Sequence, residues 1–355
     1  MSRKRRRAAR WAIGLVVLAS CVSVVRADRL VLFAGGGLGG DGVPATQAKL
    51  TEPFAIGFDT AGDAYIVELT GERLLKVDKA GILHVIAGTG KKGPGADGPA
   101  KTTTFNGPHS LAVHPTDGVF VADTWNGRIR RYDPKLGTIT AVAGKSRPQK
   151  AVYAGDGGPA LGALFSGIYS ISMTPAGDKI YLADLENRRI RVVDLKAGTV
   201  DLVAGNGAKG TPTDGAVAKE SPLVDPRACL VDPKGNVYIL ERGGNALRVV
   251  DAAGKIRTLV SGPKGGLNSP KHLCLDLAGN VILADTGNHT IRKYDVATGA
   301  LTRIAGTGKK GNSGTGGPPL EVSFNEPHGV FVHPDGTLYI VDSMNHRVFR
   351  YEKDR

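Results

Sequence analysis

One pattern that occurs six times along the chain constrains its fold more than any other feature. The second copy, Gly107 to Asp133, reads GPHSLAVHPTDGVFVADTWNGRIRRYD. Within it, short apolar or alternating runs are separated by turn residues such as Asp117-Gly118 and Asn126-Gly127. Period-two runs of four to six residues that are bounded by Gly, Asn and Asp are typical of β-strands joined by hairpin turns. Each copy therefore predicts three antiparallel strands.

The other five copies predict the same unit. They start at Pro53, Ile168, Pro226, Pro270 and Pro327. A fourth strand that ends in Gly follows each of the first five copies, as in LHVIAG and ITAVAG. Repeats of 44 to 60 residues with four strands each are typical of propeller blades, because one such unit cannot bury both of its faces alone. We therefore expect an all-β fold, a six-bladed β-propeller of four-stranded blades.

The sixth copy ends at Arg355 without a fourth strand. At the other end of the chain, Leu30 to Gly35 reads LVLFAG and matches the strands that end in Ala-Gly. We expect this N-terminal strand to complete the last blade and close the ring, which also removes a row of unpaired backbone groups.

The repeats resemble the NHL-repeat family of six-bladed β-propellers. The resemblance rests on an AD-x-x-N-x-x-IR-x-x-D core and on AG-x-G…DG-x-PA linkers, and it covers residues 29–355. It implies the fold but no single function, because the family includes RNA-binding platforms, extracellular sensor domains, adhesion modules and a metal-dependent lyase.

Residues 1–27 have the features of a signal peptide. A basic segment with Lys4 among five arginines precedes an uncharged run from Trp11 to Val25, which is short for a membrane span. Two processing sites compete: Val25-Arg26-Ala27 before Asp28, and a lipobox-like Leu18-Ala19-Ser20-Cys21 that would make Cys21 a lipidated first residue. We expect residues 28–355 to form the propeller. The protein would then be exported and be periplasmic, secreted or lipid-anchored at the cell envelope.

Much of the positive net charge of the chain comes from this N-terminal segment. The whole chain carries +13, but seven Lys and Arg residues and no acidic residue lie in residues 1–27. The remainder has 39 basic against 33 acidic residues, a net charge of +6 spread over its whole length. Such a modest excess does not indicate a nucleic-acid partner.

Candidate ligand-binding residues come from the register of the repeats. The copies align on the acidic residue that ends each second strand: Glu68, Asp123, Asp184, Glu241, Asp285 and Asp342. The position just after each blade-opening residue should then begin the innermost strand and lie at one mouth of the central channel. This position carries Phe54, His109, Tyr169, Arg227, Lys271 and His328, and His272 lies one residue out of register. Varied polar and aromatic residues at equivalent positions are typical of a site built on a repeat.

Structural roles compete with this interpretation. Phe54 and Tyr169 can simply pack between blades, and Arg227 and Lys271 can pair with Glu241 and Asp285. The six acidic residues are expected to cap hairpin turns, usually with an Asn three residues later. The arginines seven residues after four of these acids are expected to form ion pairs along solvated strand faces: Arg130, Arg191, Arg248 and Arg292.

Two kinds of enzyme are the alternatives to a binding protein. Pro108-His109-Ser110 and Pro327-His328-Gly329 resemble the zinc-binding pattern of the amidating lyases in the propeller family, so His109 and His328 are the candidate metal ligands. A catalytic zinc needs three protein ligands, and the third equivalent position holds Arg227. A lactonase-like calcium site needs carboxylate and amide ligands, which the six mouth positions lack.

The sequence favours a binding scaffold over an enzyme. We expect no cofactor, a monomer, and a protein, peptide or glycan ligand with an anionic group at the channel mouth. Membrane contact is expected only through a lipid anchor at Cys21.

Overall fold

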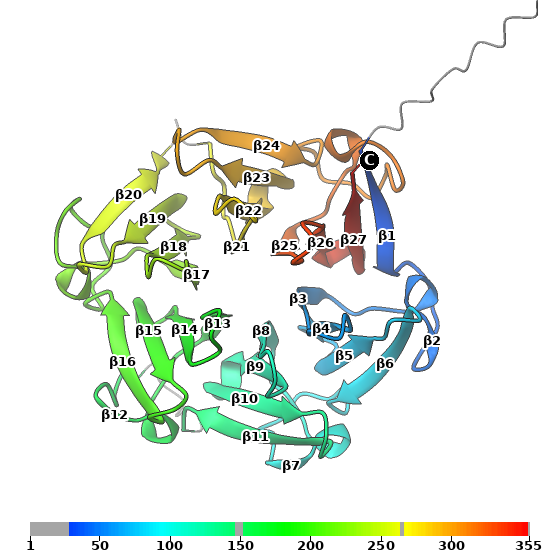
Figure 1. Cartoon of the computed structure of the whole chain (residues 1–355), viewed down its shortest axis with the longest axis horizontal. Helices are drawn as coiled ribbons and strands as arrows, with labels where there is room; N and C mark the ends of the chain where they lie inside the picture. Colours follow the sequence, from blue (N-terminus) through cyan, green and yellow to red (C-terminus); the bar gives the residue numbers. More distant parts are fainter. Residues whose placement is uncertain (1–27, 146–151, 263–265, 354–355) are drawn as a thin grey trace, which may run out of the picture.

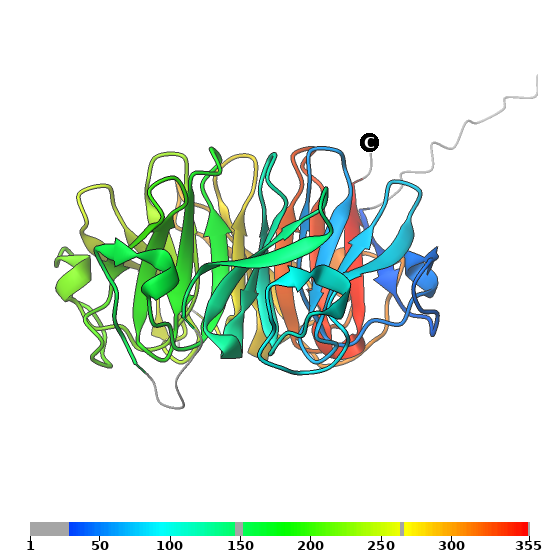
Figure 2. The same cartoon turned by 90° about the horizontal axis from the view of Figure 1, so that it is seen from below.

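Six antiparallel sheets surround a central axis in the computed structural model, which describes residues 28–145, 152–262 and 266–353 (Figure 1). Seen from the side, the ring is a disc that is wider than it is tall (Figure 2). The expected six-bladed all-β propeller is confirmed. The signal peptide expected over residues 1–27, including Cys21, lies outside the described residues.

The strands of each blade follow one another outward from the axis, except that the outermost strand of blade 6 comes from the N-terminus. Blade 1 contains β3 (Pro53–Phe58), β4 (Ala64–Glu68), β5 (Arg73–Val77) and β6 (Ile82–Ala87). Blade 2 contains β8 (Pro108–Val113), β9 (Val119–Asp123), β10 (Arg128–Asp133) and β11 (Thr138–Ala143). Blade 3 contains β13 (Ile168–Met173), β14 (Lys179–Asp184), β15 (Arg189–Asp194) and β16 (Thr199–Ala204). Blade 4 contains β17 (Pro226–Val231), β18 (Val237–Glu241), β19 (Ala246–Val250) and β20 (Ile256–Val260). Blade 5 contains β21 (His272–Leu275), β22 (Val281–Asp285), β23 (Thr290–Tyr294) and β24 (Leu301–Ala305). Blade 6 contains β25 (Pro327–Val332), β26 (Leu338–Asp342), β27 (Arg347–Glu352) and β1 (Arg29–Gly35).

Short elements fill the linkers and the hairpin turns. Two-residue strands extend the outer edges of blades 1 to 3, namely β2 (Val43–Pro44), β7 (Gly98–Pro99) and β12 (Gly158–Pro159). Single 3₁₀ turns occur at η1 (Ala45–Gln47), η2 (Ala100–Thr102), η3 (Thr124–Asn126), η4 (Ala160–Gly162), η5 (Ala218–Glu220), η6 (Thr286–Asn288), η7 (Pro319–Glu321) and η8 (Ser343–Asn345).

The N-terminal strand closes the ring as the sequence predicts. Strand β1 pairs antiparallel with β27, from Arg29 opposite Glu352 to Gly35 opposite Arg347 (Figure 1). Leu30 and Ala34 on this strand are fully buried. The first and last described strands therefore belong to one blade.

The hydrophobic core is divided among the interfaces between neighbouring blades. Six clusters of buried apolar side chains fill these interfaces. Fully buried phenylalanines from the linkers, such as Phe105 and Phe324, belong to the clusters. Consequently both faces of a blade are covered by its neighbours.

The six strand-ending acidic residues are buried parts of the frame. Each accepts a hydrogen bond of 2.6–2.8 Å from the backbone N–H two residues before the Pro or Ile that opens its blade. In four blades the Asn three residues later also donates to the acid. The predicted turn caps thus do more than close a hairpin, because they hold the linker that leads into the innermost strand.

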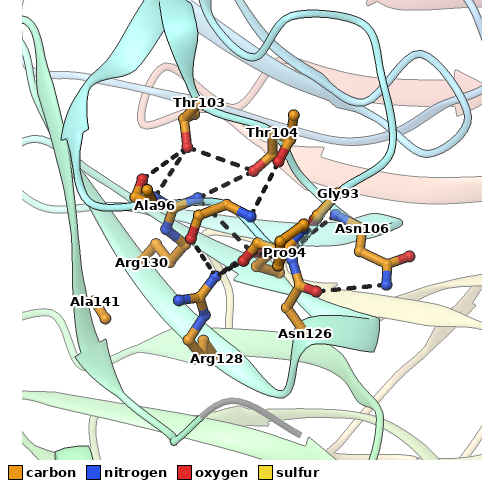
Figure 3. A network of polar contacts seen from close by, with 12 residues as sticks. Gly93, Pro94, Ala96, Thr103, Thr104, Asn106, Asn126, Arg128, Arg130 and Ala141 are labelled. Carbon is orange, nitrogen blue, oxygen red and sulfur yellow. Dashed lines mark hydrogen bonds and ion pairs between the residues drawn. The ribbon is translucent and has the colours of Figure 1, made fainter.

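The arginines that follow these acids form the predicted ion pairs but do not lie on solvated faces. Arg130, Arg191 and Arg248 are almost completely buried, and each lies 2.7–3.8 Å from the acid of its own blade. Arg130 also donates to the carbonyl oxygens of Ala96 and Thr104, at 2.5 and 3.2 Å (Figure 3). These three guanidinium groups therefore anchor the linkers to the blades, and the expectation of solvated faces is wrong for them. Arg292 is partly exposed and lies 3.7 Å from Asp285.

The interface between blades 1 and 2 contains a buried carboxyl group. Glu72 of blade 1 is buried and accepts a hydrogen bond of 2.9 Å from the Gly107 N–H of blade 2. Burial raises the pKa of Glu72 to about 7, and the Gly107 hydrogen bond offsets this only in part. The folded protein therefore binds a proton on Glu72 more tightly than the unfolded chain does, so this site stabilises the fold most at acid pH, and its contribution disappears as pH rises through about 7.

A neutral replacement should remove this pH dependence. Glu72→Gln keeps a side-chain oxygen that can accept from the Gly107 N–H, and it cannot ionise. We expect the variant to be clearly more stable than the wild type at pH 8 and to exceed it by much less at pH 5, as measured by thermal unfolding at both pH values. A stability difference that is the same at pH 5 and pH 8 would contradict the assignment, since all other groups titrate alike in the two proteins.

Candidate ligand site at the central channel

A β-bulge positions the candidate side chains in five of the blades. The register of the innermost strand shifts at its second residue, so Phe54, His109, Tyr169, Arg227 and His328 are each the extra residue of a bulge. In blade 5 the equivalent Lys271 immediately precedes β21. A bulged residue leaves the strand ladder and its side chain is re-aimed, which brings these residues together at one end of the channel.

The six side chains form a chain of contacts that we call the channel ring. Phe54 stacks on His328 with ring centroids 4.0 Å apart, and it meets His109 edge-on at 5.1 Å. His109 contacts Tyr169 at 4.6 Å, and the Arg227 guanidinium lies over the Tyr169 ring at 4.5 Å. The Lys271 Nζ lies 2.9 Å from the Nε2 of His328. All six sequence-predicted mouth positions are thus adjacent in space.

The channel ring is more closed than the sequence suggests. Phe54, His109, Arg227 and His328 are only 4–5 % exposed, whereas Lys271 and Tyr169 are partly exposed. At this end of the channel the side chains therefore cover one another. Access from solvent is greatest at Lys271 and Tyr169.

The two cations have few counter-charges. Arg227 donates to the backbone oxygen of Tyr169 at 3.0 Å, and its Nε has no hydrogen-bond partner. No carboxylate among the described residues lies within 4.0 Å of Arg227, and burial lowers its pKa to about 10. Lys271 has only a loose contact, 3.4 Å, with Glu326, whose side chain is 42 % exposed.

The pairing with Glu241 and Asp285 that the sequence leaves open does not occur. Glu241 instead binds Arg248 at 2.7 Å, and Asp285 lies 3.7 Å from Arg292. Burial, followed by repulsion from Arg227, lowers the pKa of Lys271. The two cations of the channel ring therefore repel each other without strong local neutralisation.

The two histidines of the channel ring share one hydrogen-bonding arrangement. The Nδ1 of His109 lies 2.7 Å from the carbonyl oxygen of Gly107, and the Nδ1 of His328 lies 2.8 Å from that of Glu326. A carbonyl only accepts, so Nδ1 carries the proton and Nε2 has a free lone pair in the neutral ring. Burial first, and then the nearby cations, lower the pKa of both histidines well below the usual value. Both are neutral, and His328 accepts a hydrogen bond from Lys271.

These residues do not fit a catalytic metal. The free lone pair of His328 already accepts from an ammonium group, and the third equivalent position holds a guanidinium. Within the described parts of the chain, no three His, Cys, Asp or Glu side chains are close enough together to hold a metal ion. Neither the zinc nor the calcium alternative therefore finds its ligand set here.

His272 lies apart from the ring contacts. It lines the channel itself, in a cavity of about 270 Å³ whose walls come from the innermost strands of all six blades. Most of the lining is apolar, and burial lowers the pKa of His272 to about 4. The structure thus separates His272 from the other six candidates.

Two neighbours of the channel ring were missed in the sequence. Trp125 contacts the His109 ring at 5.3 Å, and Glu326 is the only carboxylate of the described residues within 4.0 Å of Lys271. Glu326 directly precedes the opening Pro327 of its copy, and Trp125 lies two residues after Asp123. Only that adjacency to the repeat landmarks could have indicated them.

Comparisons with known proteins agree with this geometry. The sequence model of the NHL repeat matches residues 105–132 and 324–351, in blades 2 and 6. NHL repeat-containing protein 2 of Gallus gallus is 26% identical over 344 residues, which cover 85% of this chain and 46% of that protein. The chain is a six-bladed β-propeller that contains NHL repeats. Teneurin-1 of Homo sapiens is 25% identical over 57% of this chain.

The NHL-repeat propeller spans about half of the first of these relatives and 7% of teneurin-1. Among solved structures it is similar to an auxiliary nutrient binding protein from Bacteroides ovatus, with a TM-score of 0.66 and 16% identity over 92% of this chain and 76% of that one. At such identity the likeness concerns the fold alone. Within this propeller the residue type varies at the six positions of the channel ring, although the surrounding frame repeats.

Proposed function

We propose that the protein is an exported binding propeller whose channel ring recognises an anionic group on a protein, peptide or glycan ligand. The observation that carries this proposal is the pair of cations in the ring. Arg227 has no carboxylate within 4.0 Å among the described residues, and Lys271 has only the half-exposed Glu326 at 3.4 Å.

An anion would relieve an unfavourable charge arrangement. Burial, and then the positive charge of the neighbouring ring cations, lower the pKa of Lys271 and of both ring histidines. A carboxylate or phosphate group next to Lys271 would compete with the loosely held Glu326 and add a charge-assisted hydrogen bond. The partly exposed Tyr169 offers aromatic surface for the flat or apolar body of such a ligand.

Further support is indirect. One structural neighbour is an auxiliary nutrient binding protein. The basic and apolar segments of residues 1–27 favour export. No helix among the described residues is long and apolar enough to cross a bilayer. Periplasmic, secreted and lipid-anchored forms are all compatible with this proposal, and Cys21 would carry the anchor.

Replacing both cations should abolish anion recognition. In the Arg227→Met/Lys271→Met variant, each lost contact removes on the order of 1.5–3 kcal/mol. We therefore expect binding of an acidic ligand to weaken at least about tenfold. Isothermal titration with galacturonic acid, glucose 6-phosphate and a dipeptide with a free carboxyl terminus, beside neutral galactose, measures this directly.

A charge-matched control separates recognition from net charge. Lys76→Met/Arg131→Met removes two partly exposed cations outside the ring, which pair with Asp63 and Asp117, and should leave binding unchanged. Phe54→Ala should lower the melting temperature through lost packing. The proposal fails if no acidic probe binds the wild type, if wild type and ring variant bind alike, or if the ring variant unfolds.

A further inference from the structure

Four of the interfaces between blades share one hydrogen bond. The acceptor is the side chain of a residue that follows the second strand of one blade and has a left-handed backbone. The donor is the backbone N–H just before the innermost strand of the next blade. The N–H groups of Gly107, Ser269, Glu326 and Glu52 donate at 2.7–3.1 Å. The accepting side chains, all with φ between 45° and 55°, are Glu72, Asn245, His289 and His346.

The remaining two interfaces depart from this rule. Between blades 2 and 3 the equivalent residue is Gly127, which has no side chain. Between blades 3 and 4 it is Arg188, which has the same backbone conformation with φ 49°. A guanidinium has donors only and cannot accept a hydrogen bond. Accordingly, the Asp225 N–H at this interface has no acceptor among the described residues.

The second of these interfaces contains a cavity of about 340 Å³. Its lining includes three cations, Arg188, Lys209 and Arg242, and two carboxylates, Glu186 and Asp225. The Nε of Arg188 is buried and has no partner, and no ion pair of Arg188 occurs among the described residues. Arg242 is already paired with Asp225 at 2.8 Å. The other oxygen of Asp225, Oδ1, is buried without a partner, and Glu186 accepts from the Ser166 hydroxyl at 2.7 Å. Among the described residues neither Arg188 nor Lys209 has a carboxylate within 4.0 Å, so cations exceed carboxylates around this cavity.

We propose that this cavity between blades 3 and 4, which we call the interblade cavity, binds a small oxyanion: a carboxylate or a phosphate group. The anion accepts hydrogen bonds from the Arg188 guanidinium and from the Asp225 N–H, and Lys209 adds charge at the exposed rim. The bound anion thus takes the place of the side-chain hydrogen-bond acceptor that is present at four other interfaces. This site is separate from the channel ring and goes beyond the proposed function.

The chain itself suggests the test, because Asn245 fills the equivalent position at the next interface with a neutral acceptor. Arg188→Asn removes the positive charge and supplies a side-chain oxygen that can accept from the Asp225 N–H. Asn also tolerates the left-handed backbone well. Thermal unfolding is followed while inorganic phosphate or acetate replaces chloride at constant ionic strength. For the wild type we expect a saturable rise in melting temperature on the order of 2–4 °C. For Arg188→Asn we expect a higher melting temperature in chloride and no saturable response.

Two controls make the outcome specific. Glu72→Asn exchanges one acceptor for another at an interface without this cavity, so it should keep the wild-type response to phosphate. The ring variant Arg227→Met/Lys271→Met should also keep it, so failure of the channel-ring proposal and failure of this one are distinguishable. A saturable rise in melting temperature with both phosphate and acetate indicates a general oxyanion site. A rise with only one of them shows whether the site prefers phosphate or carboxylate groups. The inference is overturned if the wild type shows no saturable response, or if Arg188→Asn responds like the wild type.

Discussion

Deletion of residues 28–36 is expected to prevent formation of a stable ring. The deletion removes β1, which pairs with β27 along its whole length and buries Leu30 and Ala34 completely. Loss of one buried leucine alone costs about 2–5 kcal/mol, and the exposed edge of β27 becomes a template for aggregation. Since whole domains are stable by only about 5–15 kcal/mol, we expect insoluble protein or a melting temperature lowered by tens of degrees.

Point variants on the same strand control for the deletion itself. Leu30→Asp places a carboxylate in the core between blades 5 and 6 and should act nearly as strongly. Arg29→Ala removes a half-exposed side chain that pairs with Glu352, and it should have little effect. Thermal unfolding, together with sedimentation of the soluble fraction, tests these expectations. Unchanged unfolding of the deletion variant would show that the blade does not need this strand.

Replacement of Arg191 by Met is expected to destabilise the protein by about 3–5 kcal/mol, the usual cost of leaving a buried charge without its partner. The guanidinium is fully buried and binds Asp156 at 2.5 Å and two linker carbonyls at 2.9 Å. It also lies 3.6 Å from Asp184, whose pKa burial raises to about 6. Without Arg191, the Asp184 carboxylate is left buried and the linker loses its anchor.

Chemical unfolding of three variants distinguishes this mechanism from a general loss of charge. Arg131→Met removes a partly exposed partner of Asp117 and should cost less than about 1 kcal/mol. In Arg191→Met/Asp184→Asn the uncompensated carboxylate is absent, so part of the loss should be recovered. If Arg191→Met and Arg131→Met have equal effects, the buried arginines are not the anchors of the linkers.

The architecture could be predicted almost completely from the sequence. Six copies of one strand pattern require a closed array of sheets, and the unmatched LVLFAG segment at the start supplies the strand that the last copy lacks. Alignment on the six strand-ending acids also places Phe54, His109, Tyr169, Arg227, Lys271 and His328 at one end of the channel. These inferences succeed because strand alternation and turn-forming residues are local features of the sequence, and all six copies contain them.

The exposure and the partners of those side chains depend on contacts between blades, which the sequence of a single repeat does not show. Bulges re-aim five of the ring residues, so that they cover one another instead of lining an open mouth. Arg227 meets the Tyr169 ring of the preceding blade, and Lys271 meets His328 of the following one. The interblade cavity likewise arises between two copies, where Arg188 faces Asp225.

The arginines after the acids show the physical reason most clearly. Successive side chains of a strand point to opposite faces of its sheet. In an isolated sheet, the face that carries the polar side chains would lie in water. In a closed propeller each blade is covered on both faces by its neighbours, so Arg130, Arg191 and Arg248 are buried against their own acids and the linkers. The sequence by itself therefore determined which residues alternate and how often the unit repeats. Only the closure of the ring decided which of those faces would meet solvent.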